Sequence, residues 1–196
     1  LIMIEFLFRL DYFLLLRINA LHAPWLDEIM WVLSSKWINF PLALCILLLL
    51  KSQFSWKKTS ILFLLTLVVV SLTDVISTQL FKDYFERLRP SHDPIVSHYL
   101  HFYMIAPNNP YLGGQYGFVS SHAANLAALF AFIFPYLKKY TYSIYALGIY
   151  VFLVAYSRVY LGVHFPSDVL CGALLGLAIG CLFRRYLFAQ LIQKWD

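Results

Sequence analysis

Three short stretches of the sequence combine cationic, hydroxyl and imidazole side chains that together suit the binding of an anion. They read KDYFERLRP, VSSH and SRVYLGVHFPSD, and they occupy residues 82–90, 119–122 and 157–168. Lys82 and Arg89 are seven residues apart, so on a continuous helix they would share one side. With Arg158 they would form a cationic site for a phosphate, because guanidinium groups pair with phosphoryl oxygens and an ammonium adds a point charge.

The two serines of the middle stretch stand where a long apolar run begins. If that run is a helix, the hydroxyl groups of Ser120 and Ser121 would strengthen anion binding, together with the free N–H groups of the helix start. A plain helix cap is the alternative role of Ser120, and the two roles are compatible.

The histidines could supply nucleophilic and acid–base chemistry. His164 and Asp168 are four residues apart, and Pro166 between them is tolerated in the first turn of a helix. Asp168 would then hydrogen-bond one imidazole nitrogen and leave the other free as a nucleophile or base. His122 supplies a second imidazole. Displacement at phosphorus requires one basic nitrogen to attack and one N–H to protonate the leaving group.

Taken singly, each of these residues has an ordinary explanation. A single histidine at a membrane interface is usually structural, and an arginine near the end of a span usually extends towards lipid headgroups. The coincidence of all three stretches at one membrane face would favour chemistry, so the elements that carry them matter.

The composition indicates a membrane protein built from α-helices. Hydrophobic residues make up 61% and charged residues 13% of the 196 residues, and the mean hydropathy is +0.71. This balance is far from that of a soluble domain. We therefore expect an all-α, polytopic helix bundle that forms a single membrane-embedded domain over residues 1–196.

Five apolar runs are long enough to cross, or nearly cross, about 30 Å of hydrocarbon. They cover residues 31–50, 59–81, 118–137, 140–156 and 166–183. The first run is interrupted by Lys36 and Asn39, and Pro41 would kink it. Residues 1–24 are too charged for a span and predict an amphipathic helix on the membrane surface. We expect about five transmembrane helices and one N-terminal interfacial helix.

The last apolar run carries a stripe of small residues. Gly172, Gly176 and Gly180 recur at four-residue intervals and so lie on one side of a helix. Such a stripe lets a neighbouring helix approach closely, so we expect a packing role for it.

The distribution of lysine and arginine predicts which loops face the cytoplasm. One side carries eight basic residues: Lys51, Lys57, Lys58, Lys138, Lys139, Arg184, Arg185 and Lys194. The other side carries seven basic residues, and three of these are the candidate phosphate ligands. Without those three, the comparison is eight basic residues on the first side against four on the second. The positive-inside rule then places the 51–58 loop in the cytoplasm and the long 82–117 loop outside. All three chemistry-bearing stretches reach this outer face, and we expect the 82–117 loop to cover a site there.

These residues resemble the signature of the type 2 phosphatidic acid phosphatase family, which consists of integral membrane enzymes and is related to the vanadium haloperoxidases. The first part of that signature is Lys-x6-Arg-Pro, and it matches Lys82, Arg89 and Pro90. The third part is Ser-Arg-x5-His-x3-Asp, and at the same spacing it matches Ser157, Arg158, His164 and Asp168.

The middle part of the signature, Pro-Ser-Gly-His, is degenerate in this sequence. Ser120 and His122 fit it, whereas Val119 replaces the proline and Ser121 replaces the glycine. These replacements leave the serine and the histidine in place but change the residues that shape the helix start.

The resemblance implies a phosphohistidine mechanism without a metal or other cofactor. In that mechanism His164 attacks phosphorus, Asp168 orients it and His122 protonates the departing oxygen. The phosphoryl group would be held by Lys82, Arg89, Ser120 and Arg158. The position of Ser121 at the helix start, rather than the resemblance, predicts its hydroxyl group as a further phosphate ligand.

The resemblance also implies a substrate class and a location. We expect a lipid phosphate phosphatase of a bacterial cytoplasmic membrane, with the active site on the outer face and no nucleic-acid partner. Polyprenyl diphosphate, phosphatidylglycerol phosphate, phosphatidic acid and lipid A phosphates are the implied substrates. Two alternatives stay open: a vanadate-dependent haloperoxidase, against which the apolar runs argue, and a transporter that uses the cationic site to bind a lipid or an anion.

Overall fold

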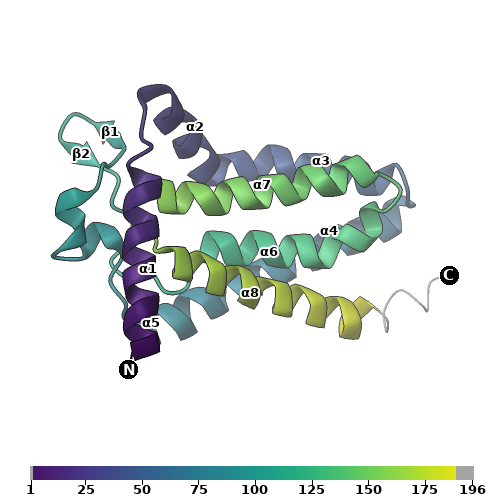
Figure 1. Ribbon diagram of the computed structural model, residues 1–196. Helices are drawn as coiled ribbons and strands as arrows, with labels where there is room; N and C mark the ends of the chain where they lie inside the picture. Colours follow the sequence, from purple (N-terminus) through teal and green to yellow (C-terminus); the bar gives the residue numbers. More distant parts are fainter. Residues whose placement is uncertain (1, 189–196) are drawn as a thin grey trace.

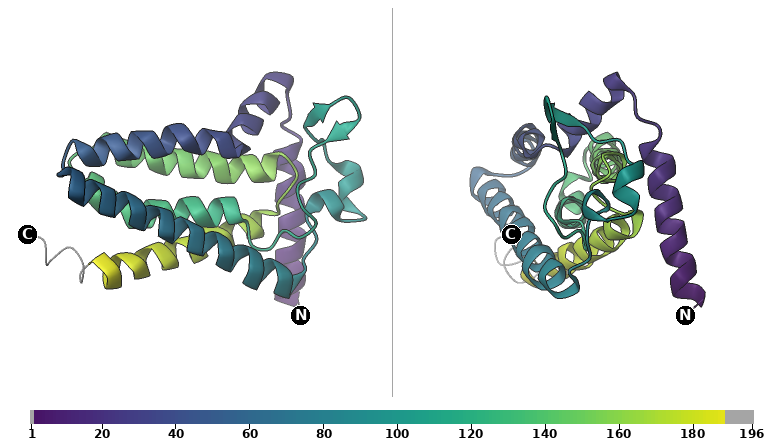
Figure 2. Two further views of the ribbon diagram at one scale, coloured as in Figure 1. Left: turned by 180° about the vertical axis from the view of Figure 1, so that it is seen from behind. Right: turned by 90° about the vertical axis from the view of Figure 1, so that its left-hand side faces the viewer.

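The long helices of the protein run side by side, and one helix crosses them at one end (Figure 1). The computed structural model describes residues 2–188, so Lys194 of the charge count lies outside the described residues. The bundle consists of α3 (Asn39–Lys51), α4 (Trp56–Val75), α6 (Ser121–Ile133), α7 (Thr141–Tyr160) and α8 (Pro166–Phe183). Helix α1 (Ile2–Asn19) lies across the end of the bundle opposite the C-terminus, and α2 (Pro24–Ser34) connects it to α3 (Figures 1 and 2).

Helix α4 continues well beyond its regular part. The π-helical segment Ile76–Lys82 and the short α5 (Asp83–Phe85) extend it to a single apolar helix of 30 residues, Trp56–Phe85. At about 1.5 Å per residue this helix exceeds the thickness of the hydrocarbon core. Glu86, with a φ of 47°, ends it in the left-handed region. Lys82 therefore stands near the end of this long helix, at the end of the bundle that α1 crosses (Figures 1 and 2).

Length and composition support part of the expected membrane topology. Three described helices are long and apolar enough to cross a membrane, namely Trp56–Phe85, Thr141–Tyr160 and Pro166–Tyr186. Helices α2 and α3 qualify as a fourth span only as a pair bent by 60°. The helix Ser121–Leu137, which ends in the 3-10 turn Phe134–Leu137, is apolar but shorter. The all-α membrane bundle is confirmed, with three or four candidate spans among the described residues.

The bend between α2 and α3 does not fall at the proline. Helix α2 ends at Ser34, and a 3-10 turn, Lys36–Ile38, precedes α3. The Oγ atom of Ser35 accepts a hydrogen bond from Trp37 N and so caps this turn. Pro41 lies in the first turn of α3, where no helical N–H bond is lost, so the chain bends earlier than the sequence predicted.

The glycine stripe of α8 packs against α6, as the sequence predicted. A Cβ atom at Gly172 would lie 2.5 Å from the carbonyl oxygen of Ser120. Cβ atoms at Gly176 and Gly180 would overlap backbone carbonyls further along α6. This close contact brings the first turn of α8 beside the first turn of α6, where Ser120 N donates to Asp168 O over 2.9 Å.

The segment between α5 and α6 covers the end of the bundle that α1 crosses. It contains 3-10 turns at Pro90–His92 and Val96–Tyr99 and a small antiparallel hairpin of β1 (Met104–Ala106) and β2 (Asn109–Pro110). Asn19 at the end of α1 holds it in place. Its Nδ2 donates to His101 O and Tyr160 O, both over 2.8 Å, and its Oδ1 accepts from His101 N.

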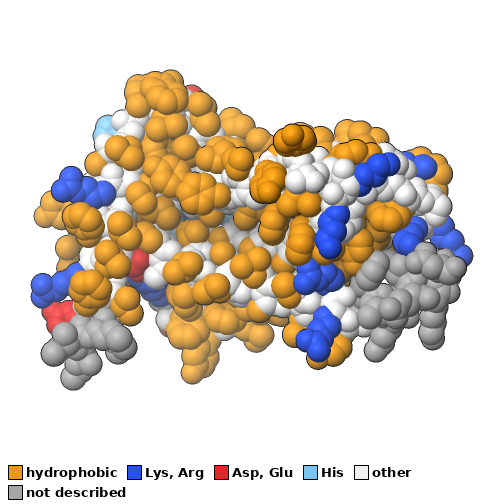
Figure 3. All heavy atoms as spheres, turned by 45° about the vertical axis from the view of Figure 1, so that its right-hand side comes forward, with side chains coloured by type: hydrophobic (Ala, Val, Ile, Leu, Met, Phe, Trp, Pro, Cys, Tyr) orange, Lys and Arg blue, Asp and Glu red, His pale blue; other side chains and the backbone are white. Residues whose placement is uncertain are grey.

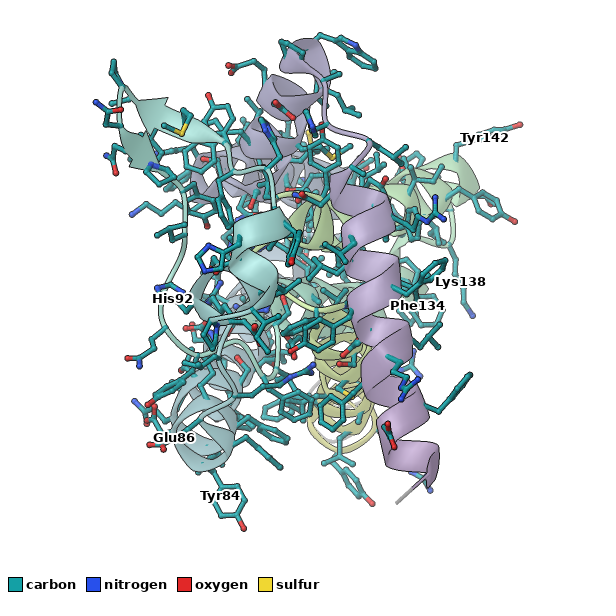
Figure 4. All side chains as sticks on the ribbon, turned by 60° about the vertical axis from the view of Figure 1, so that its left-hand side comes forward. Tyr84, Glu86, His92, Phe134, Lys138 and Tyr142 are labelled. Atoms are coloured by element: carbon teal, nitrogen blue, oxygen red, sulfur yellow. The ribbon has the colours of Figure 1, made fainter. Side chains whose placement is uncertain are left out.

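The surface of the bundle is apolar along its length. On the face shown in Figure 3, hydrophobic side chains cover most of the helices, and several basic side chains gather towards the end that carries the C-terminus. Tyr84 and Tyr142, at opposite ends of the bundle, point away from the helices with exposed fractions of 81% and 89% (Figure 4). Exposed aromatic residues at both ends suit a helix bundle whose ends lie at membrane interfaces.

Candidate active site

Backbone pairing positions the two arginines of the first stretch. Arg89 N donates to Gln115 O over 3.0 Å, and Gly117 N donates to Arg87 O over 2.8 Å, so the two ends of the covering loop pair with each other. A Cβ atom at Gly117 would lie 3.0 Å from Asp168 Oδ2 and 3.2 Å from Arg89 Cγ. Glycine at this position lets the loop bring both arginines against the start of α8.

Lys82 and Arg89 face the start of α6. Lys82 Nζ donates to Ser121 Oγ over 2.9 Å. Arg89 is buried, and its Nε donates to Tyr116 O over 3.0 Å, which fixes the plane of the guanidinium group. Burial and the nearby charge of Arg158 lower the pKa of Arg89 to about 10. Cations that repel one another in this way favour an anion between them.

Arg158 is the most deeply buried of the three cations, with 1% of its surface exposed. Its guanidinium group donates to Ser34 Oγ at the end of α2 and to Tyr111 OH, the latter over 3.1 Å. Its buried Nε has no partner within the described chain. A buried cation with only neutral partners and an unpaired donor requires a compensating anion, so Arg158 is a candidate phosphate ligand.

The two serines play different structural parts. Ser120 occupies the N-cap position of α6, but its side chain makes no capping hydrogen bond. Its Oγ is buried and has no partner among the residues that the structure describes. The Ser120 hydroxyl group therefore does not cap α6, so the alternative role predicted for it is not seen in this structure. Ser121, by contrast, faces Lys82 and lines a groove together with His122.

His164 and Asp168 approach each other as their spacing predicted. Helix α8 begins at Pro166, and Nδ1 of His164 lies 3.5 Å from Asp168 Oδ2. That distance exceeds an ordinary hydrogen bond. Oδ2 instead accepts from Phe165 N over 2.9 Å, and Nδ1 has no hydrogen-bond partner in the described chain. A small movement of the imidazole ring would complete the pair.

Burial and positive charge keep the His164 imidazole neutral. The side chain is 1% exposed, and its pKa lies well below 6.5 because of burial first and then the charges of Arg89, Arg158 and Lys82. A neutral imidazole has a free lone pair and can act as a nucleophile at neutral pH. Two of the predicted cations contact this turn of the chain: Arg89 Nη1 donates to Val163 O over 3.4 Å, and His164 N donates to Arg158 O over 3.2 Å.

Sequence reasoning missed the contacts that hold Asp168. Arg87 Nη1 donates to Asp168 Oδ1 over 2.8 Å, and its Nη2 donates to Asp11 Oδ2 of α1 over 2.7 Å. Asp11 also accepts from the backbone N of Ser167 over 2.8 Å, and Arg87 lies over the ring of Phe165 at 4.3 Å. Two features of the sequence could have predicted these contacts: Asp11 lies in a largely apolar N-terminal helix, and Arg87 is a second arginine in the 82–90 stretch.

A groove of about 600 Å³ leads away from the cations along the helices. Polar residues line one end of it, among them Lys82, Arg89, Ser121 and His122. Apolar residues of α3, α4 and α6 line the rest, among them Leu42, Ile46, Phe63, Leu67 and Leu129. His164, Arg158, Asp168 and Ser120 are buried and are not part of this lining. The arrangement fits a phosphate attached to a long apolar group.

Comparison with known sequences decides the family. The sequence pattern that describes the PAP2 superfamily matches residues 59–192, which include all three chemistry-bearing stretches. The chain belongs to the PAP2 superfamily. Its signature residues Lys82, Arg89, Arg158 and His164 lie in the region of that match.

Relatives of this PAP2 protein with an assigned function or a known crystal structure act on lipid phosphates. The lipid A 4'-phosphatase of Porphyromonas gingivalis is 32% identical to it over 97% of the chain. The lipid A 4'-phosphatase of Bacteroides thetaiotaomicron is 33% identical to it over 92% of the chain. Each match covers 78% of the relative. The crystal structure of a transmembrane PAP2 type phosphatidylglycerolphosphate phosphatase from Bacillus subtilis superposes with a TM-score of 0.68 at 27% identity, covering 97% of this chain and 89% of that one.

This PAP2 protein is an integral membrane lipid phosphate phosphatase. The relatives favour hydrolysis over the transporter and haloperoxidase alternatives. Among the described residues, no group of three or more His, Cys, Asp or Glu side chains is arranged to hold a metal ion.

Proposed function

We propose that this PAP2 phosphatase removes a phosphate from a membrane lipid through a covalent intermediate on His164. The observation that carries the proposal is the groove, which joins a cationic end at Lys82 and Arg89 to an apolar length between the helices. The phosphate would lie at the cationic end beside His122, and the lipid chain would extend along the groove. His164 is buried outside the groove lining, so its covalent role rests on its match to the family signature.

In the proposed first step the imidazole lone pair of His164 attacks phosphorus and the bond between phosphorus and the lipid oxygen breaks. His122 donates a proton to that oxygen, so the lipid leaves as an alcohol. Lys82, Arg89 and Arg158 neutralise the phosphoryl oxygens, and the unpartnered Ser120 hydroxyl supplies a hydrogen-bond donor. In the second step water attacks the phosphohistidine, His122 accepts the proton, and inorganic phosphate leaves.

Lipid A and phosphatidylglycerol phosphate are the substrates that the relatives suggest, and phosphatidic acid and polyprenyl diphosphate are further members of the same class. All combine a phosphate with apolar chains, and the groove offers both environments. We further propose that the site faces the extracytoplasmic side of a bacterial cytoplasmic membrane, with α1 lying along the interface. The excess of basic residues at the opposite end of the bundle supports this orientation.

The proposal is tested by phosphate release from these four lipid phosphates in detergent micelles, with EDTA present throughout. We expect release from at least one of them, inhibition by vanadate, and full activity in EDTA, because the three cations neutralise the phosphoryl oxygens. His164→Asn should release no phosphate from any of the four. Binding of the lipids without release of phosphate would contradict hydrolysis, and activity that needs a divalent ion would contradict the metal-free mechanism.

A further inference from the structure

The groove contains a carboxylate at the depth of the apolar helices. Asp74 lies in α4, eight residues before Lys82, and lines the groove. The alkyl and aromatic side chains of Leu67 and Phe63 line the same groove deeper in the bundle. A carboxylate at this depth costs free energy unless it is paired, so the partners of Asp74 are informative.

Asp74 has one side-chain partner in the described chain. Asn125 Nδ2 donates to Asp74 Oδ1 over 2.8 Å. No described donor reaches the second oxygen, Oδ2, although the side chain is exposed in the groove. An amide on one oxygen orients the carboxylate and leaves its other oxygen free to accept a hydrogen bond.

The free oxygen lies close to the phosphate end of the groove. Asn125 follows His122 by three residues, so it stands about one turn, or ~5 Å, further along α6. Asp74 reaches Asn125, so a lipid whose phosphate lay beside His122 would place its next atoms at the level of Asp74. Deeper in the groove the lining is apolar and suits the chains themselves.

We propose that Asp74, oriented by Asn125, accepts a hydrogen bond from an N–H or O–H group that the substrate carries beside its phosphate. A sugar phosphate with an amide-linked acyl chain offers such a donor. The ester-linked chains of phosphatidic acid offer none, because an ester oxygen is only an acceptor. This inference rests on the proposed function and narrows it to lipid phosphates that carry a hydrogen-bond donor beside the phosphate, such as the amide N–H of an N-acylated sugar phosphate or the glycerol O–H of phosphatidylglycerol phosphate.

The test uses two synthetic substrates that differ in one linkage: an N-acylated glucosamine 4-phosphate and the corresponding 2-O-acylated glucose 4-phosphate. In both, the remaining ring hydroxyl groups are methylated, so the amide N–H is the only donor near the phosphate. We expect the wild-type protein to favour the amide in kcat/KM by about tenfold or more, the effect of one hydrogen bond to a charged group. Asp74→Leu should bring the ratio close to one. Asp74→Asn, which keeps the size of the side chain, should lower the ratio in the same direction.

Taking the ratio of the two substrates removes effects that they share, such as a change in the field at Lys82. Ser71→Leu is the matched control, because it makes a polar-to-leucine change one turn earlier in α4 at a residue that is not part of the groove lining. It should leave the ratio as in the wild type. Phosphate release with the same ratio in all variants would overturn this inference alone, whereas no release from any lipid phosphate would overturn the proposed function as well.

Discussion

At the scale of single residues, the two histidines of the site differ in their exposure and in their proposed tasks. His122 lines the groove, whereas His164 is buried beside Asp168. If His122 is the general acid, its loss should matter most for a basic leaving group. A lipid monoester expels an alkoxide that needs a proton, whereas a prenyl diphosphate expels a much less basic phosphate.

We therefore predict that His122→Ala forms phosphoenzyme slowly with phosphatidic acid and comparatively fast with a prenyl diphosphate. Rapid-quench measurement of the first turnover checks this and avoids the later step, in which the same imidazole activates water. His164→Asn serves as the control and should form no phosphoenzyme with either substrate. Equal slowing with both substrates would rule out the general-acid role of His122.

The electrostatics of His164 lead to a prediction about pH. Burial and the three cations hold its pKa below 6.5, so the imidazole stays neutral and active as the pH falls through 6.5. The acid limb of kcat/KM should therefore lie below pH 6.5. Arg89→Met removes the largest of these charge effects, so the His164 pKa should rise and the limb should move to higher pH.

The substrate phosphate also titrates in this range, but its contribution is the same for both enzymes. The difference between the two pH–rate profiles therefore reports a group of the protein. A limb that stays at the same pH in Arg89→Met, with only its height reduced, would show that His164 does not set it.

At the scale of elements, α1 takes part in the site through one contact chain. Asp11 of α1 holds Arg87, and Arg87 holds Asp168, which faces His164. We predict that Asp11→Asn lowers kcat about tenfold or more with little change in KM, because a weakened charge-assisted pair lets Asp168 and His164 move out of line. Steady-state kinetics on a lipid monoester measure this directly.

Glu5→Gln is the matched control on the same helix. Glu5 pairs with Arg9 over 2.7 Å, but both side chains are largely exposed, and such pairs contribute little. Its kinetics should equal those of the wild type. A rise in KM with unchanged kcat in Asp11→Asn would instead assign α1 to lipid binding.

At the scale of the whole molecule, the two ends of the bundle should face opposite sides of the membrane. In a background without Cys45, Cys171 and Cys181, we predict that Tyr99→Cys reacts with a membrane-impermeant thiol reagent in intact cells, and Lys139→Cys reacts only after lysis. Both native side chains are exposed in the structure. The basic residues near Lys139 favour the cytoplasm for that end. The reverse labelling pattern would invert the proposed orientation.

The sequence by itself determined the class of protein and the set of chemically active side chains. Hydropathy depends on consecutive residues, so it predicts apolar helices without knowledge of the fold. The signature spacing from Arg158 to Asp168 likewise depends on a single turn and helix start, and the structure places His164 beside Asp168 accordingly. Lengths near the limit for a span, as in Ser121–Leu137, were less well predicted, because helix ends depend on caps and turns.

Only the tertiary structure decided how these residues are held and which surface the substrate meets. Arg87 lies 81 residues from Asp168 and 76 from Asp11, so their pairing follows from the packing of α1 and the covering loop against α8. The division of roles between Ser120 and Ser121, and the pairing of Asp74 with Asn125, depend in the same way on α4 and α6 lying together. Such contacts join residues far apart in the chain, and local patterns carry no information about them until the helices pack.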